Sequence, residues 1–345
     1  MRKEGSVKQS VCIYALCFVP ALALAGQLGR EESLTSSVRS ARLQVTDETP
    51  FNTHNFRLFV GGFRCDTEGN VFFIPGLPGT VKAPAIVVRV SADGKSPTTF
   101  SLPSTLCVAD SSDVTINAMA LDTQGQLTVL ADVRAEAGTR QYLASFDDGG
   151  QLRSKVELDP SQIVAQRFAV FDSGDILLLG YRSGHGARSA QPRVAVMAAN
   201  GESLRDVVPP TALSSSTWLT TDGLSFAEPA TDGHVYFAPE SGPAYAITPS
   251  AEISRTIHLV SPEKGAGLVA LKISGPRLAA IYEVQDKQPS VRWVAVHDLG
   301  SGRQVASYGP VQNLVMCYRP EGSHDRFTLL GGRGGRSLLF NASAP

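Results

Sequence analysis

Polar and charged side chains stand at the starts of apolar segments that recur about every fifty residues along this 345-residue chain. They are His54, Asn55, Arg57, Asn117, Gln166, Arg167, Thr221, Asp222, Gln312 and Asn313, and a further segment offers only Lys264. Amides and guanidinium groups bind polar and anionic groups through directed hydrogen bonds. If the segments lie side by side, these residues would surround one opening. We therefore expect either a site for a polar or anionic small molecule or peptide terminus there, or simply a solvated rim.

Spacings typical of catalytic sites are missing from the sequence. The six histidines are scattered singly, without the His-x-His or His-Glu-x-x-His spacing of zinc sites. No Gly-x-Ser-x-Gly elbow for a nucleophilic serine occurs. The leading hypothesis is therefore a binding or interaction module without its own chemistry. The second hypothesis is a hydrolase or lyase that uses His54, Asp222 or Arg167, and a third is a subunit of an envelope assembly.

Two glycine-rich segments resemble ligand loops. Residues 181–193 combine three arginines with His185, so they either cover an anionic ligand or form an ordinary connecting loop. Residues 331–336 read Gly-Gly-Arg-Gly-Gly-Arg but precede a strand-like segment, whereas a phosphate loop leads into a helix N-terminus. We interpret the second segment as a turn.

The elements that must position these residues are short strands in a repeating unit. An Asp- or Ser-containing turn with glycine precedes an apolar strand at residues 66–74, 122–130, 172–179, 231–237, 274–281 and, in a worn copy, 324–330. A second apolar strand ends in a polar hairpin near residues 94, 149, 201, 251 and 300. Asp-Gly and Asn-Gly suit such hairpins because they accept positive φ. Strand-only repeats of this length are typical of a β-propeller.

The repeats divide the chain into six blades of four strands. The expected blades are 56–104, 114–159, 164–210, 215–260 and 265–310, and a sixth that begins at residue 314. The sixth has only three strands before the chain ends. Residues 42–46 are the one strand-like segment left over, so we expect this N-terminal strand to complete the last blade and close the ring.

This layout resembles the six-bladed β-propeller superfamily, in the broad group of NHL-repeat and TolB-like propellers. The resemblance covers nearly all of the chain after residue 25 and rests on the repeat spacing and on the turns at Asp66 and Asp122. It implies an all-β fold of four-stranded antiparallel blades. A likeness to gluconolactonase-like propellers would imply a divalent metal, with Asn117, Asp222 and Asn313 as the nearest equivalents. No glutamate begins the first inner strand, so we expect no metal and no cofactor.

The first twenty-five residues read as an export signal. Three basic residues precede an apolar run from Val11 to Leu24, and Ala23-Leu24-Ala25 is a small-x-small cleavage site. The run is short for an uncleaved membrane anchor, which is the alternative. We therefore divide the chain into a signal peptide (1–25), an N-terminal extension with the closing strand (26–55) and the propeller (56–345), and expect a periplasmic or secreted protein.

Cysteines outside the signal are three: Cys65, Cys107 and Cys317. Cys65 and Cys317 fall late in the inner strands of the first and last blades, which are neighbours in a closed ring. Central strands are expected to lie further apart than the Cα separation of about 4.4–6.8 Å that a disulfide tolerates. We therefore expect buried, unpaired thiols. If a bridge forms, the expected pair is Cys65 and Cys317.

Overall composition excludes some partners. A net charge of −1, a hydrophobic content of 43% and a charged content of 18% are ordinary for a globular protein with a core. Sparse aromatic residues and the absence of a basic excess argue against nucleic-acid binding. We expect a monomer whose partner is a small polar ligand or another protein.

Overall fold

A computed structural model describes residues 40–51, 57–76, 85–92, 97–102, 106, 113–136, 138–182, 191–208, 226–239, 242–284, 290–322, 324–333 and 336–344. Of residues 57–62, 76 and 336 only the backbone is described. These segments belong to one compact unit, Val38–Pro345. In the described part of the chain no helix is long and apolar enough to cross a membrane.

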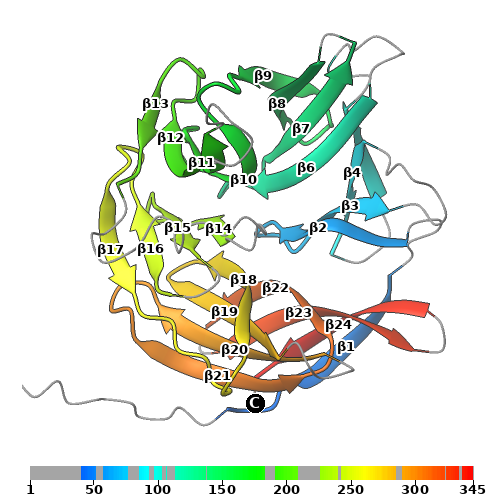
Figure 1. Cartoon of the computed structure of the whole chain (residues 1–345). Helices are drawn as coiled ribbons and strands as arrows, with labels where there is room; N and C mark the ends of the chain where they lie inside the picture. Colours follow the sequence, from blue (N-terminus) through cyan, green and yellow to red (C-terminus); the bar gives the residue numbers. More distant parts are fainter. Residues whose placement is uncertain are drawn as a thin grey trace, which may run out of the picture. The chain divides into compact units, whose positions relative to one another are not determined.

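Six four-stranded antiparallel sheets form the blades (Figure 1). Blades one to three are β2 (Arg57–Cys65), β3 (Val71–Gly76), β4 (Ile86–Val90), β5 (Pro97–Ser101); β6 (Asp113–Leu121), β7 (Leu127–Ala135), β8 (Gly138–Phe146), β9 (Leu152–Leu158); β10 (Val164–Val170), β11 (Ile176–Arg182), β12 (Gln191–Met197), β13 (Leu204–Asp206). Blades four to six are β14 (Phe226–Pro229), β15 (Val235–Ala238), β16 (Ala244–Ile247), β17 (Ile253–Ile257); β18 (Gly267–Ser274), β19 (Arg277–Val284), β20 (Val291–Asp298), β21 (Gln304–Val311); β22 (Leu314–Glu321), β23 (His324–Arg333), β24 (Arg336–Ser343), with β1 (Gln44–Pro50) outermost. The predicted six-bladed propeller is confirmed. The blade limits agree within about four residues, except that the first described strand of blade four begins at Phe226 and the prediction began that blade at residue 215.

The inner strands form a closed ring. Each of β2, β6, β10, β14 and β18 contacts the inner strand of the next blade, and β22 contacts β2. A buried apolar cluster lies between every pair of neighbouring blades within the described residues. Strand side chains alternate between the two faces of a sheet, and neighbouring blades cover both faces. This is why the strands read as near-continuous apolar runs.

The turns between the first and second strands follow the predicted chemistry. The carboxylate of Asp122 accepts the backbone N–H groups of Gln124 and Gln126 at 2.9 and 2.8 Å, and Asp66 accepts that of Asn70 at 2.9 Å. The turn glycines have positive φ, including 88° at Gly69 and 80° at Gly125. Only glycine adopts this conformation without strain.

The hairpins between the third and fourth strands agree with the predicted positions in blades three and four, where Gly201 has a φ of 79°, and differ from them in blades two and five. Positive φ occurs at Gly150 (82°) and Gly302 (70°), not at residues 149 and 300. Each turn is one or two residues longer than expected, because an aspartate side chain (Asp147 or Asp298) binds backbone N–H groups within the turn. In blade four Ala251 holds the equivalent position with φ of 68°.

The closing strand is the N-terminal β1, as predicted, but it is displaced along the sequence. It spans Gln44–Pro50, not residues 42–46, and pairs antiparallel with β24 from Gln44↔Ser343 to Pro50↔Leu338 (Figure 1). Phe51, directly after β1, is buried against Phe73 of blade one with ring centroids 5.5 Å apart. The buried Phe51 side chain anchors the end of β1, which is consistent with the pairing between β1 and β24 extending to Pro50.

The prediction of unpaired thiols was wrong. Cys65 of β2 and Cys317 of β22 form a disulfide with a Cα separation of 5.7 Å. Register shifts upstream of both cysteines, between Val60 and Phe63 and between Val315 and Cys317, bend the two inner strands. The strands therefore approach more closely than regular inner strands were expected to. Cys107 lies outside the described residues.

Removing the disulfide should destabilise the ring. In the loop-entropy description, a bridge that spans 252 residues stabilises the folded state by up to about 5 kcal/mol. Chemical denaturation of the Cys65→Ser, Cys317→Ser double variant should show a loss of this order. Reductant should destabilise the parent chain and leave the double variant unchanged. Equal unfolding midpoints for both chains would contradict a stabilising bridge.

A glycine in blade three should not tolerate a side chain. A Cβ at Gly180 of β11 would lie 2.1 Å from the carbonyl oxygen of Val164 and 2.9 Å from the Cα of Ala165. Because both neighbours are backbone atoms, Gly180→Ala should destabilise the protein by roughly 1–3 kcal/mol. The matched control is Gly267→Ala in β18, where no heavy atom lies within 4 Å. Equal denaturation midpoints for the two variants would contradict this close approach.

Candidate functional site

Four charged side chains from four blades converge near the centre of the ring. They are Arg64 of β2, Arg167 of β10, Glu228 of β14 and Lys272 of β18. The Oε1 atom of Glu228 lies 3.6 Å from Arg64 Nη1 and 3.8 Å from Lys272 Nζ. The side chains of Arg64, Glu228 and Lys272 are only 19, 14 and 11% exposed. This group, called the central cluster below, therefore lies largely out of bulk water.

Strand alternation places these side chains. Their chain neighbours Phe63, Phe168, Ala227 and Leu271 are buried in the apolar clusters between blades. Because successive side chains of a strand point to opposite faces, burying one neighbour between blades turns the next residue away from that cluster. The inter-blade packing thus fixes the orientation of the central cluster.

Lys272 is held in place by two oxygen atoms. Its Nζ donates to the carbonyl oxygen of Phe63 at 2.9 Å, and Glu228 is the carboxylate beside it. Burial lowers the pKa of Lys272 to about 8, the charge of Glu228 opposes this effect, and Arg64 lowers the pKa further. A lowered pKa means that the neighbouring oxygen atoms do not fully replace the hydration that the ammonium group loses on burial.

Arg167 carries an additional positive charge. Burial and the neighbouring Arg64 lower the pKa of its guanidinium group. Its Nη1 donates to the carbonyl oxygens of Gln166 at 2.9 Å and of Asn117 at 3.5 Å. No carboxylate pairs with Arg167 among the described residues. The central cluster therefore holds three cationic side chains and one anionic side chain within the described part of the chain.

β-bulges bring two sequence-predicted residues to Arg167. The strand register shifts between Ile116 and Ala118, and between Ala165 and Arg167, leaving Asn117 and Gln166 without directly opposed partners. Bulges re-aim the local backbone and are frequent beside functional sites. Here they direct the carbonyl oxygens of both residues at the Arg167 guanidinium group.

None of the other predicted site residues is found in the central cluster within the described part of the chain. His54, Asn55, Thr221 and Asp222 lie outside the described residues, as do His185 and the middle of its loop. Arg57 begins β2, but its side chain is not described. Lys264 is exposed in a turn. Residues 331–336, predicted to be a turn, are mostly strand: Gly331, Gly332 and Arg333 end β23 and pair with β24, and Arg336 begins β24. Residues 334–335 lie outside the described residues, and a strand follows the segment as expected.

Gln312 and Asn313 line a separate cavity of ≈ 600 Å³ beside β1 and blades five and six. Most of its other lining residues are apolar, including Trp293, Val311 and Leu329. Its walls therefore differ in chemistry from the central cluster.

Sequence reasoning missed Arg64, Glu228 and Lys272. It considered the first residues of the inner strands, whereas these three lie near the ends. The available signal was a charged residue flanked by apolar residues just before a turn, as in Phe63-Arg64-Cys65 and Leu271-Lys272-Ile273. A charge inside an apolar strand must find a partner in the fold, because an unpaired buried charge is costly.

A small cavity opens where the inner strands end. It has a volume of ≈ 90 Å³ and is lined by Arg64, Glu228, Arg319 of β22 and first-turn residues of several blades, including Asp66 and Asp122. Burial raises the pKa of Asp122. A water occupies about 30 Å³ in the liquid, so the cavity holds a group of only a few heavy atoms. No cluster of three or more His, Cys, Asp and Glu side chains among the described residues could hold a metal ion.

Comparisons with known proteins identify the fold. No family model matches the sequence, and no curated protein matches it. The structure is similar to a member of the DUF4221 family from Bacteroides vulgatus, with a TM-score of 0.55 and 8% identity over 88% of this chain and 98% of that chain. PQQ-bound aldose sugar dehydrogenase from Streptomyces coelicolor gives 0.46 and 13% over 86% and 98%. The Cps50 (Swd1) β-propeller domain of Myceliophteria thermophila gives 0.44 and 11% over 83% and 98%.

The lowered pKa of Lys272 makes stability depend on pH. The unfolded chain holds the lysine proton up to a pKa of 10.5, and the folded chain holds it only to about 8. Between these values the unfolded state binds more protons, so the free energy of unfolding contributed by this group rises with pH. One pKa unit is worth about 1.4 kcal/mol, so the gain from pH 8 to pH 10.5 is up to about 3 kcal/mol.

Lys272→Met should remove this gain. Denaturation of the parent and the variant between pH 7 and pH 10.5 should show the parent gaining stability relative to the variant. Substitution of the exposed Lys264 by Met is the matched control and should follow the parent profile. A parent-minus-variant difference that does not change with pH would disprove the assignment.

Proposed function

We propose that this chain is an exported β-propeller that acts as a ligand-binding module, with the central cluster as its site. The ligand presents an anionic group, as a small polar acid or a peptide C-terminus does. The observation that carries the proposal is the charge imbalance. Among the described residues, the three cations Arg64, Arg167 and Lys272 are accompanied by one carboxylate, Glu228, which pairs with Arg64 and Lys272 but not with Arg167. A preorganised group of buried cations favours the binding of an anion.

Side-chain chemistry supports an arginine-based anion site. A guanidinium group offers five N–H donors, and Arg167 uses Nη1 for both of its described hydrogen bonds. Its remaining donors can receive a carboxylate or phosphate oxygen. Charge-assisted hydrogen bonds of this kind are roughly twice as strong as neutral ones.

The export part of the proposal rests on residues 1–25 and on the disulfide. A basic leader, an apolar run and a small-x-small site are typical of a cleaved signal. The Cys65–Cys317 bridge supports an oxidising compartment, because cytosolic thiols are normally kept reduced. Periplasm and extracellular space both satisfy this condition.

An enzymatic function is the alternative. A gluconolactonase-like hydrolase or lyase would place its site at the mouth of the ring, with Arg167 joined there by His54 and Asp222. Of these three residues only Arg167 is described, and it contacts backbone carbonyl oxygens. We propose binding without turnover because the charge imbalance of the central cluster favours an anion.

The first test is a titration of the purified chain with acetate, citrate, sulfate and phosphate, followed by calorimetry and by the thermal unfolding midpoint. Arg167→Gln should weaken the binding of the anion with the highest affinity by about 10- to 100-fold. This is the effect expected when one charge-assisted hydrogen bond worth about 1.5–3 kcal/mol is lost. Arg303→Gln removes the same charge from an exposed hairpin and is the matched control, expected to change affinity less than twofold.

Each alternative has a distinct outcome in this test. Binding of no anion, or equal weakening in the two variants, would overturn the central cluster as the site. Hydrolysis of gluconolactone by the parent chain that is lost in Arg167→Gln would instead establish the enzymatic alternative.

A further inference from the structure

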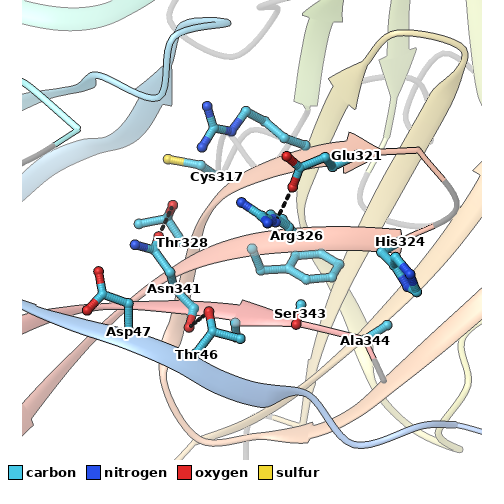
Figure 2. A pocket seen from close by; sticks show the side chains of 13 residues that line it. Thr46, Asp47, Cys317, Glu321, His324, Arg326, Thr328, Asn341, Ser343 and Ala344 are labelled. Carbon is cyan, nitrogen blue, oxygen red and sulfur yellow. Dashed lines mark hydrogen bonds and ion pairs between the residues drawn. The ribbon is translucent and has the colours of Figure 1, made fainter.

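A third cavity, of ≈ 540 Å³, lies against the sheet of blade six and is called the blade-six hollow below (Figure 2). Its wall includes a cross-strand row that runs from Cys317 through Thr328 and Asn341 to Asp47, residues that pair in register across β22, β23, β24 and β1. Arg319 pairs with Arg326, which pairs with Ser343, and these three also line the hollow. The hollow therefore depends on the closing strand, because β1 contributes Thr46 and Asp47.

Polar residues at this place depart from the pattern of blades three and five. On the faces that blades three and five turn to the next blade, the paired residues are Leu177 with Val196 and Ala279 with Val296, all buried in apolar clusters. Blade six has Thr328 with Asn341 instead. A polar pair stabilises a packed core less than an apolar pair does, so packing alone does not account for these residues.

Blade two shows what a purely structural polar pair looks like. Thr128 and Ser145 also face each other across two strands, and their hydroxyl groups hydrogen-bond at 2.8 Å. Thr128 is 4% exposed, and no cavity described in the chain is lined by either residue. The polar row of blade six differs because it faces open space.

The formal charges of the hollow balance. Arg326 forms an ion pair with Glu321, visible in Figure 2, and Arg319 and Asp47 supply one further charge of each sign. No hydrogen bond or ion pair joins Arg319 to another described residue. A strongly charged ligand would meet both signs in the wall, so charge gives neither anions nor cations an advantage.

The wall of the hollow offers both hydrogen-bond donors and hydrogen-bond acceptors to a ligand. Thr328 donates to the Oδ1 atom of Asn341 at 3.3 Å. This bond uses the amide oxygen of Asn341 and leaves its NH₂ group as an available donor. Asp47 accepts the backbone N–H of Glu48 at 2.8 Å through Oδ1, and its Oδ2 is an available acceptor. Ser343 and the Arg319 guanidinium group add further capacity. Donors and acceptors are thus interspersed along one wall.

We infer that the blade-six hollow binds a neutral polyhydroxylated molecule, a sugar or a polyol. Each hydroxyl group of such a ligand both donates and accepts, which matches an interspersed wall of amide, hydroxyl, guanidinium and carboxylate groups. The volume lies within the range of about 300–1,000 Å³ usual for small-molecule sites. This site is separate from the central cluster and does not depend on the function proposed for that cluster.

The test uses glucose, maltose and myo-inositol as probes of the full chain, with saturation-transfer NMR and titration to concentrations of about 50 mM, suited to millimolar affinities. At least one probe should bind. Asn341→Leu should lower the affinity for that probe by about tenfold, and Thr328→Val should lower it by about threefold. These changes are in line with the loss of one or two neutral hydrogen bonds.

Thr128→Val makes the same substitution in the closed polar pair of blade two and should leave sugar affinity unchanged. Thermal unfolding of each variant checks that it folds, and Thr328→Val, nearly equal in volume, keeps the test valid if Asn341→Leu does not fold. Lack of saturation transfer from the protein to any of the three probes would overturn the inference. So would equal affinities in Thr328→Val and Thr128→Val, or binding of citrate or lysine at the hollow in preference to the sugars.

Discussion

Closure of the ring between blade six and blade one is the constraint on which the rest of this structure depends. Blade six receives its outermost strand from the N-terminal segment, so the last sheet is complete only when β1 pairs with β24. Without that pairing the unpaired edge of β24 would be open to other chains. The disulfide between β2 and β22 joins the same two blades at their inner strands. The seam is thus held at its inner and its outer edge.

Buried polar groups inside the ring differ in how fully they are compensated. Asp325 of blade six is 2% exposed and accepts hydrogen bonds from Tyr308, Tyr318 and Arg277 at 2.6, 2.8 and 2.8 Å. This carboxylate joins blades five and six and is saturated by its partners, which is the arrangement expected of a structural group. The central cluster differs, because its cations outnumber the described carboxylate. An incompletely compensated buried group is more costly and is therefore the better functional candidate.

The two proposed sites differ in electrostatic character, and one residue, Arg319, lies beside both. The central cluster is cationic, whereas the blade-six hollow is balanced in charge. Arg319 lines both the hollow and the small cavity beside Arg64. Its guanidinium group lies against the turn of blade one, where a Cβ on Gly69 would come within 3.0 Å of it. Arg319 is therefore a wall residue of both spaces, and both depend on a closed ring.

The architecture follows from local features of the amino-acid sequence. Turn chemistry is local: Asp122 binds the backbone two and four residues later, and Gly125 takes a positive φ, so these turns can be recognised without knowing any distant contact. Their period of about fifty residues then requires blades. The use of an N-terminal strand to complete the last blade also followed from the sequence, because only one strand-like segment was left over.

Which distant residues meet depends on how the six blades pack around the ring. Arg64, Glu228 and Lys272 belong to three blades, and a local pattern shows that each is flanked by apolar residues but not that their side chains converge. The bulges that present Asn117 and Gln166 to Arg167 arise from the register between strands, which residue types do not specify. The Cys65–Cys317 bridge was misjudged for the same reason. Its Cα separation of 5.7 Å depends on how bulged strands approach across the closed seam, a property of the whole ring.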